Sequence, residues 1–142
     1  MSAINRAARK VPPRWMPIGN ESELCSAGEW WDVIRVTEAV GRRAIAILRG
    51  ELVSIGAVFF QPDGPEPRLY FLVPVGVAAH WNEPETVSLG RNCHVVVPQA
   101  SALAPPGLHW HVFPANARGL TDPEGLRKAL GKARRERQGP SE

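Results

Sequence analysis

Residues 55–73 read IGAVFFQPDGPEPRLYFLV, which is the clearest structural signal in the chain. Two apolar runs, residues 55–60 and 69–73, flank a proline-rich segment at 62–67 that also holds aspartate and glycine. Apolar runs of this length with turn-forming residues between them are typical of a β-hairpin. The sequence therefore predicts two antiparallel strands joined by a longish loop, and their aromatic side chains supply bulk for a core.

Three other segments, residues 30–36, 94–97 and 108–113, carry shorter strand signals. The run at 94–97 is rich in valine and stops at Pro98, which suits a strand that is buried on both faces. Residues 75–92 show no clear periodicity, so we interpret them as a loop or a broken helix. The chain is thus expected to contain four to five strands.

A first helix is expected to follow Thr37, which is a suitable N-cap residue, and to run to about Arg49. Gly50 follows the last periodic residue, where a left-handed helix cap favours glycine. Gly41 lies inside this helix and weakens it by roughly 1 kcal/mol relative to alanine. The pattern predicts an amphipathic helix with one apolar stripe.

A second helix is predicted near the C-terminus. Thr121 can cap its start, Pro123 fits the first turn, and Glu124 stands where a capping box places its acidic partner. Its narrow apolar stripe consists of Leu126, Ala129, Leu130 and Ala133. Basic residues follow in its C-terminal half, where they complement the helix dipole.

These elements predict an α+β fold: a single compact domain with a mostly antiparallel or mixed sheet of four to five strands and two main helices. A length of 142 residues leaves room for one domain. We expect residues 1–28 to form a flexible basic arm that can place Trp15 on the domain. Residues 29–130 are expected to form the domain, and residues 131–142 a basic C-terminal tail.

The composition limits the class of protein. Hydrophobic residues make up 44% and charged residues 22% of the chain, which argues against wholesale disorder. No apolar run approaches the roughly 18 residues that a membrane span needs, and the basic N-terminus lacks the apolar stretch of a secretory signal. Cys25 and Cys93 are too few for a disulfide scaffold. We therefore expect a cytoplasmic protein that does not contact a membrane.

Positive charge is concentrated at both ends of the chain. Residues 1–14 carry four basic side chains and no acid, and residues 127–142 carry six basic side chains and two acids, so the net charge of +3 leaves −5 on residues 15–126. An acidic body repels a phosphate backbone, so the ends are the expected nucleic-acid contacts. The candidates are Arg9, Lys10, Arg14, Lys132, Arg134, Arg135 and Arg137. The alternative is that the charged ends only increase solubility.

A metal site is a weaker hypothesis. Cys93 and His94 are adjacent, and His109 and His111 are expected to project from the same face of one strand. These side chains have ligand chemistry suited to zinc, but the spaced cysteine pairs of structural zinc sites are absent from the sequence. The sequence contains no complete catalytic signature and no phosphate-binding glycine loop. We assign no catalytic residues and expect no cofactor.

Tryptophan is frequent, with five residues in the chain. Most tryptophans pack in cores, and exposed ones occur at interfaces with protein partners or stack on single-stranded bases. Trp81 and Trp110 stand beside proline-rich segments, so they are candidates for a partner surface. A protein-interaction or regulatory module without a nucleic-acid role is therefore the alternative function.

Several short motifs together resemble a known family. They are residues 31–36 (WDVIRV), 56–58 (GAV), 69–74 (LYFLVP), 89–98 (LGRNCHVVVP) and 109–110 (HW). This series resembles the later part of bifunctional DNA primase/polymerase N-terminal domains, and more closely their small, degenerate versions in high-GC bacteria. The resemblance covers about residues 30–130.

The sequence also departs from the family pattern. Active members of that family use an Asp-x-Asp-like carboxylate pair for metals, and this sequence contains no such pair. His94 stands where the family has an aromatic residue or glycine, so the nucleotide-binding role is not assigned to it. The resemblance therefore implies a relative of these domains that has lost catalysis. Together with the basic ends, it leads us to expect an accessory protein that binds DNA or a nucleoprotein partner through those ends.

Overall fold

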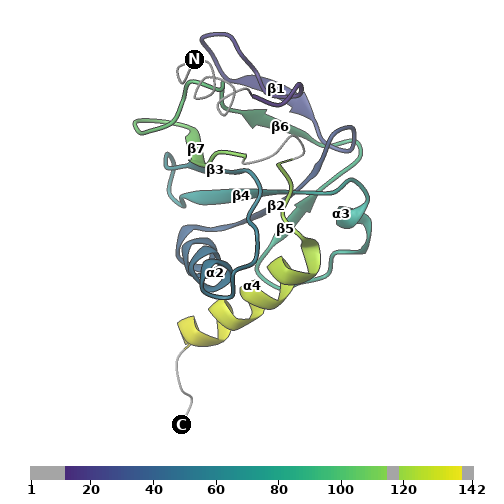
Figure 1. The fold of residues 1–142 in the computed structure, drawn as a ribbon, viewed down its shortest axis with the longest axis vertical. Coiled ribbons are helices and arrows are strands. Elements are labelled where there is room, and N and C mark those ends of the chain that lie inside the picture. The colour runs from purple at the N-terminus through teal and green to yellow at the C-terminus, as the bar shows by residue number, and fades with distance from the viewer. Residues whose placement is uncertain (1–11, 115–118, 139–142) are drawn as a thin grey trace, which may run out of the picture.

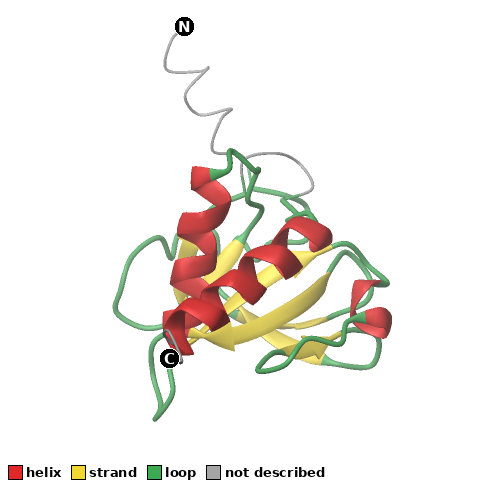
Figure 2. Cartoon of the chain, turned by 90° about the horizontal axis from the view of Figure 1, so that it is seen from below, coloured by secondary structure: helices red, strands yellow, loops and turns green. Residues whose placement is uncertain are grey.

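The computed structural model describes residues 12–114 and 119–138. A five-stranded antiparallel sheet has the order β5-β2-β4-β3-β7. Its strands are β2 (Asp32–Thr37), β3 (Val58–Gln61), β4 (Arg68–Val73), β5 (Val87–Leu89) and β7 (His109–Val112). Two long helices, α2 (Glu38–Gly50) and α4 (Pro123–Gln138), cover one face of this sheet (Figures 1 and 2). The predicted α+β fold is confirmed.

The predicted hairpin is formed by β3 and β4, with Val58 opposite Phe71. Successive side chains of a strand point to opposite faces, and this alternation divides the core into two clusters. Phe71 packs in the cluster under the two helices, whereas Tyr70 and Leu72 belong to the cluster on the other face. The central strands are therefore covered on both sides.

Helix α2 begins after Thr37 as predicted, although the Thr37 side chain makes no capping hydrogen bond. The predicted left-handed cap at Gly50 is wrong, because Gly50 belongs to the helix and the left-handed residue is Leu52, with φ 59°. A Cβ atom on Gly41 would lie 2.6 Å from Cδ1 of Leu69 on β4. Glycine at this position therefore lets α2 pack closely on the sheet.

The start of α4 differs from the predicted capping box. The Oδ2 atom of Asp122 accepts a hydrogen bond of 2.8 Å from the backbone N–H of Gly125, so Asp122 caps the helix. Thr121 is buried, and its Oγ1 atom accepts a hydrogen bond of 2.8 Å from the N–H of Gly56. Glu124 pairs instead with an arginine one turn further along the helix. Thr121 therefore connects the start of α4 to the residues that precede β3.

A two-stranded antiparallel ribbon lies against the other face of the sheet (Figure 1). It consists of β1 (Glu23–Ser26) and β6 (His94–Val97). The strand predicted at 94–97 exists, but the prediction that both of its faces are buried is wrong. Val95 and Val97 are buried against the sheet, whereas Val96 is 46% exposed beside Leu24 of β1. The ribbon is an outer layer, so its strands alternate between buried and exposed residues.

The described N-terminal residues pack on the domain instead of forming a separate arm. Of the predicted arm at 1–28, residues 1–11 lie outside the described residues. Met16 is 3% exposed in the second core cluster, and the ring of Trp15 lies edge-on to Trp31 with 5.9 Å between centroids. The placement of Trp15 on the domain is as predicted, but β1 was not predicted.

The C-terminal boundary also differs from the prediction. Residues 131–138 continue α4, and Ala133 is 1% exposed in the core cluster under the helices. Residues 139–142 lie outside the described residues. In the part of the chain that the structure describes, no helix combines the length and apolar character needed to cross a membrane.

The segment at 75–92 contains a short helix, α3 (Val77–His80), and the edge strand β5. The prediction of a loop or broken helix missed β5, which is only three residues long. Strand β5 pairs with β2 and places Val87 opposite Arg35. This pairing forms one wall of the site described next.

Candidate functional site

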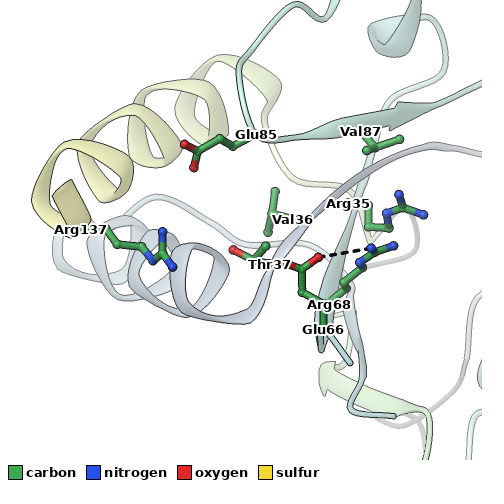
Figure 3. Close-up of a pocket in the computed structure, with 8 residues that line it drawn as sticks. All are labelled: Arg35, Val36, Thr37, Glu66, Arg68, Glu85, Val87 and Arg137. Atoms are coloured by element: carbon green, nitrogen blue, oxygen red, sulfur yellow. Dashed lines mark hydrogen bonds and ion pairs between the residues drawn. The ribbon is translucent and has the colours of Figure 1, made fainter. Parts of the chain in front are cut away.

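A cavity of about 360 Å³ opens at the end of the sheet where β2 ends and β4 and β5 begin, beside the last turn of α4 (Figure 3). We call it the arginine groove. Its lining residues are Arg35, Val36, Thr37, Glu66, Arg68, Glu85, Val87 and Arg137. The three arginines come from three different elements, β2, β4 and α4.

Two of the arginines share one face of the sheet. Arg35 on β2 is opposite Tyr70 on β4, and Arg68 precedes Tyr70 by two residues. Residues two apart on a strand point to the same face, so Arg35 and Arg68 are diagonal neighbours, about 7–8 Å apart. Arg137 extends into the groove from the α4 side (Figure 3). The register of β2 and β4 therefore brings separate cations to one place.

Two of the three arginines are available to bind an anion. Arg68 pairs with Glu66 at 3.4 Å, and their side chains are 35% and 61% exposed. An ion pair with this exposure contributes little. Arg35 and Arg137 form no ion pair with any acid among the described residues. Because Glu85 is the only other acid in the lining, the groove carries a net charge of +1.

The nucleic-acid candidates predicted from charge are spread over the molecule. Arg9 and Lys10 lie outside the described residues, and Arg14 is exposed in the N-terminal segment. Arg135 is exposed on α4, and of the predicted residues that the structure describes, Arg137 alone lines the arginine groove.

Two predicted contacts already have acidic partners. Lys132 Nζ lies 2.5 Å from Oε2 of Glu51 at the end of α2, so this pair joins the two long helices. Arg134 Nη2 lies 3.6 Å from Oε1 of Glu83, and the Arg134 side chain is only 14% exposed. These two side chains are less available to a phosphate than Arg35 or Arg137.

Sequence reasoning missed Arg35 and Arg68. The available signal was local: Arg35 interrupts the apolar residues of β2, and Arg68 begins the aromatic strand β4. A lone cation within a buried strand indicates a position where the sheet meets solvent. Counting charges along the chain could not detect Arg35 and Arg68, because both belong to residues 15–126, which carry a net negative charge.

The predicted partner surface is not formed. Trp110 is 3% exposed, and its Nε1 donates a hydrogen bond of 3.1 Å to the carbonyl of Gln99. Trp81 is half-buried against the helix-side core, and its Nε1 donates to Thr86 Oγ1 at 2.9 Å. Trp110 is therefore a core residue and does not present its ring to a partner.

The metal candidates lie on different sides of the molecule. His109 packs edge-on against Phe60 on the α2 side of the sheet, and its Nδ1 lies 2.7 Å from the carbonyl of Gly107. Cys93 packs with the opposite cluster, and His94 is exposed on the ribbon. Within 12–114 and 119–138, no three His, Cys, Asp or Glu side chains are grouped to hold a metal ion.

Lowering the pH from about 7 to about 5 is expected to destabilise the protein partly through His111. Burial, and then the charges of Arg42 and Arg49, lower the pKa of His111 below its ordinary value of about 6.5. The unfolded chain then binds a proton that the folded chain resists, so the free energy of unfolding falls as the pH drops below about 6.5. Urea unfolding at both pH values measures this loss. It should be smaller for His111→Gln, and an equal loss in both proteins would contradict the assignment.

No protein-family model, curated protein or solved structure matches this chain. The arginine groove is the strongest basis for a functional proposal, because three arginines line it and two of them have no ion-pair partner among the described residues.

Proposed function

We propose that this chain binds single-stranded DNA through the arginine groove, as a non-catalytic accessory protein of the cytoplasm. The observation that carries the proposal is that Arg35, Arg68 and Arg137 line one cavity, two of them without an ion-pair partner among the described residues. Guanidinium groups suit phosphate because their planar donors can form two parallel hydrogen bonds with its oxygens.

The surroundings of the groove favour a single strand. Tyr70 lies between Phe59 and Arg35 in the strand register and is half-buried, with its ring stacked on Phe59 at 4.6 Å. Proteins that bind single strands combine arginine or lysine contacts to phosphate with aromatic rings near the bases. The resemblance to primase/polymerase domains supports DNA as the polymer, and the missing Asp-x-Asp pair supports a role without catalysis.

The alternative function, a protein-interaction module with a Trp/Pro-rich surface, has weaker support. It required Trp81 and Trp110 on the surface, and Trp110 is buried. The basic chain ends keep a secondary role in the proposal, because Arg135 and Arg137 lie in the last turn of α4.

Fluorescence anisotropy with labelled single-stranded and double-stranded oligonucleotides, titrated over salt, tests the proposal. Replacing Arg35, Arg68 and Arg137 together with alanine should weaken single-strand binding by about tenfold or more and reduce the salt slope by about 2. The matched control replaces Arg43, Arg127 and Lys132, which also removes three positive charges but from residues that are paired with Glu136, Glu124 and Glu51.

The control variant should keep the wild-type salt slope. Equal losses in both triple variants would mean that only net charge matters, and absence of wild-type binding at low salt would exclude the proposal. A truncated protein, residues 12–138, separates the groove from the chain ends. The deletion stops at residue 138 because earlier removal would cut α4, in which Ala133 is buried. Binding that is lost completely on truncation would assign the contact to the ends instead.

A further inference from the structure

A buried carboxylate at the other end of β2 has no role in the arginine groove. Asp32 is 2% exposed, and its Oδ2 atom accepts hydrogen bonds of 2.9 Å from the backbone N–H groups of Gly76 and Ala78. These bonds hold the start of α3. The second oxygen, Oδ1, is buried and has no hydrogen-bond partner among the described residues.

Asp32 lines a second cavity, of about 690 Å³. The cavity is bounded by α3, by the residues just before β2 and by the turn between β5 and β6. Asp32 and Arg35 are three residues apart on one strand, so they lie about 10 Å apart and point to opposite faces. The second cavity is therefore separate from the arginine groove.

Fold stability does not account for Oδ1. A buried carboxylate oxygen without a hydrogen-bond donor is costly, and such groups are rare in folded proteins. Both hydrogen bonds that hold the start of α3 are accepted by Oδ2 of Asp32, so Oδ1 is not needed for them. Gly90 also lines the cavity, and a Cβ atom there would lie 2.8 Å from Cβ of Ala78 and 3.3 Å from Asp32 Oδ2. A side chain at position 90 would therefore crowd the carboxylate.

The cavity lining also carries a cation. Arg91 lines the cavity, is exposed, and forms no ion pair with an acid within the described part of the chain. The lining thus combines a buried acceptor with an exposed arginine, and Val75 and Ala79 add apolar surface. Opposite charges on a cavity of this size suit a small ligand that itself carries opposite charges.

We propose that this cavity binds a small zwitterionic molecule whose guanidinium group donates to Oδ1 of Asp32 and whose carboxylate meets Arg91. Guanidinium fits a buried carboxylate better than ammonium does, because it is planar and more weakly hydrated. The ligand would supply the hydrogen bond that Oδ1 lacks. This inference does not depend on DNA binding at the arginine groove.

The test is a titration with L-arginine, followed by ¹H–¹⁵N NMR. The amide signals of Gly76 and Ala78 report directly on the Asp32 carboxylate, because their N–H groups bond to it. We expect saturable shifts of both signals. L-citrulline lacks the positive charge, so it should bind about tenfold to hundredfold more weakly, which is the range of a charge-assisted hydrogen bond. Agmatine lacks the carboxylate and should bind more weakly to the wild type.

Three variants complete the test. Asp32→Asn keeps an oxygen for Gly76 and Ala78 but removes the charge, so L-arginine should bind about tenfold to hundredfold more weakly. Arg91→Ala should make L-arginine and agmatine bind equally. Ala79→Trp fills the cavity from an exposed position and should abolish binding, which keeps the test decisive if Asp32→Asn does not fold. No saturable shift in the wild type, or unchanged affinity in Ala79→Trp, would overturn the proposal.

Discussion

Gly56→Ala is expected to lower the free energy of unfolding by about 3 kcal/mol or more, at the upper end of what overpacking a core usually costs. A Cβ atom at position 56 would lie 2.3 Å from the carbonyl carbon of Leu120 and 2.6 Å from the carbonyl oxygen of Gly119. Both are backbone atoms, so no side-chain rotation relieves the clash. Separation of these segments would also stretch the hydrogen bond from Gly56 N–H to Thr121.

Urea unfolding followed by tryptophan fluorescence measures this effect, and Gly50→Ala is the matched control. Position 50 lies in α2, and a Cβ atom there would meet no atom within 4 Å. The same substitution is therefore expected to stabilise the protein by about 0.5–1 kcal/mol, because alanine restricts the unfolded chain more than glycine does. A Gly56→Ala protein as stable as the wild type would show that residues 119–121 do not pack on this segment.

The elements that the sequence predicted well are those whose signals are local. The hairpin of β3 and β4 has two apolar runs with a proline-rich segment between them, and α2 has Thr37 at its start and an amphipathic stripe. These features act within a few residues of one another. Strand β5 and strand β1 are short, and their partners lie far along the chain, so no local pattern indicated them.

The start of α4 shows how a distant contact decides between two local choices. Thr121 and Asp122 are both residues that cap helices, and they are adjacent. The backbone N–H of Gly56, 65 residues earlier, donates a hydrogen bond to the Thr121 hydroxyl oxygen. The Thr121 side chain therefore does not cap the helix, and Asp122 caps it instead. A capping pattern read from the sequence includes no information about that donor.

The candidate site was predicted less well than the fold, for a related reason. Charge counting identifies a dense run such as the end of α4, where Arg137 lies, but Glu51 and Glu83 reach that run from other elements and pair with part of it. Arg35 and Arg68 are isolated in the sequence and meet only through the register of β2 and β4. The groove is therefore a product of strand pairing more than of charge density.

Trp110→Ala is expected to lower the free energy of unfolding by about 3–5 kcal/mol, the usual cost of truncating a buried tryptophan. The Trp110 ring contacts those of Phe59, Trp15 and Phe113, with centroid distances of 5.5, 5.9 and 6.2 Å. Truncation would also leave the Gln99 carbonyl without the hydrogen bond from Nε1. One residue therefore joins β7, β3 and the N-terminal segment.

Trp30→Ala is the control, because this tryptophan is 50% exposed and its loss should change stability by about 0.5 kcal/mol or less. The comparison separates the two roles that the sequence left open for Trp110. If Trp110 is a core residue, Trp110→Ala should be far less stable than Trp30→Ala in urea unfolding. If Trp110 instead binds a partner, both variants should be close to the wild type in stability. The second result would contradict the packing of β7 on β3.

Because Trp110 neighbours the half-buried Trp15, the Trp110→Ala substitution should also expose the N-terminal segment to proteolysis.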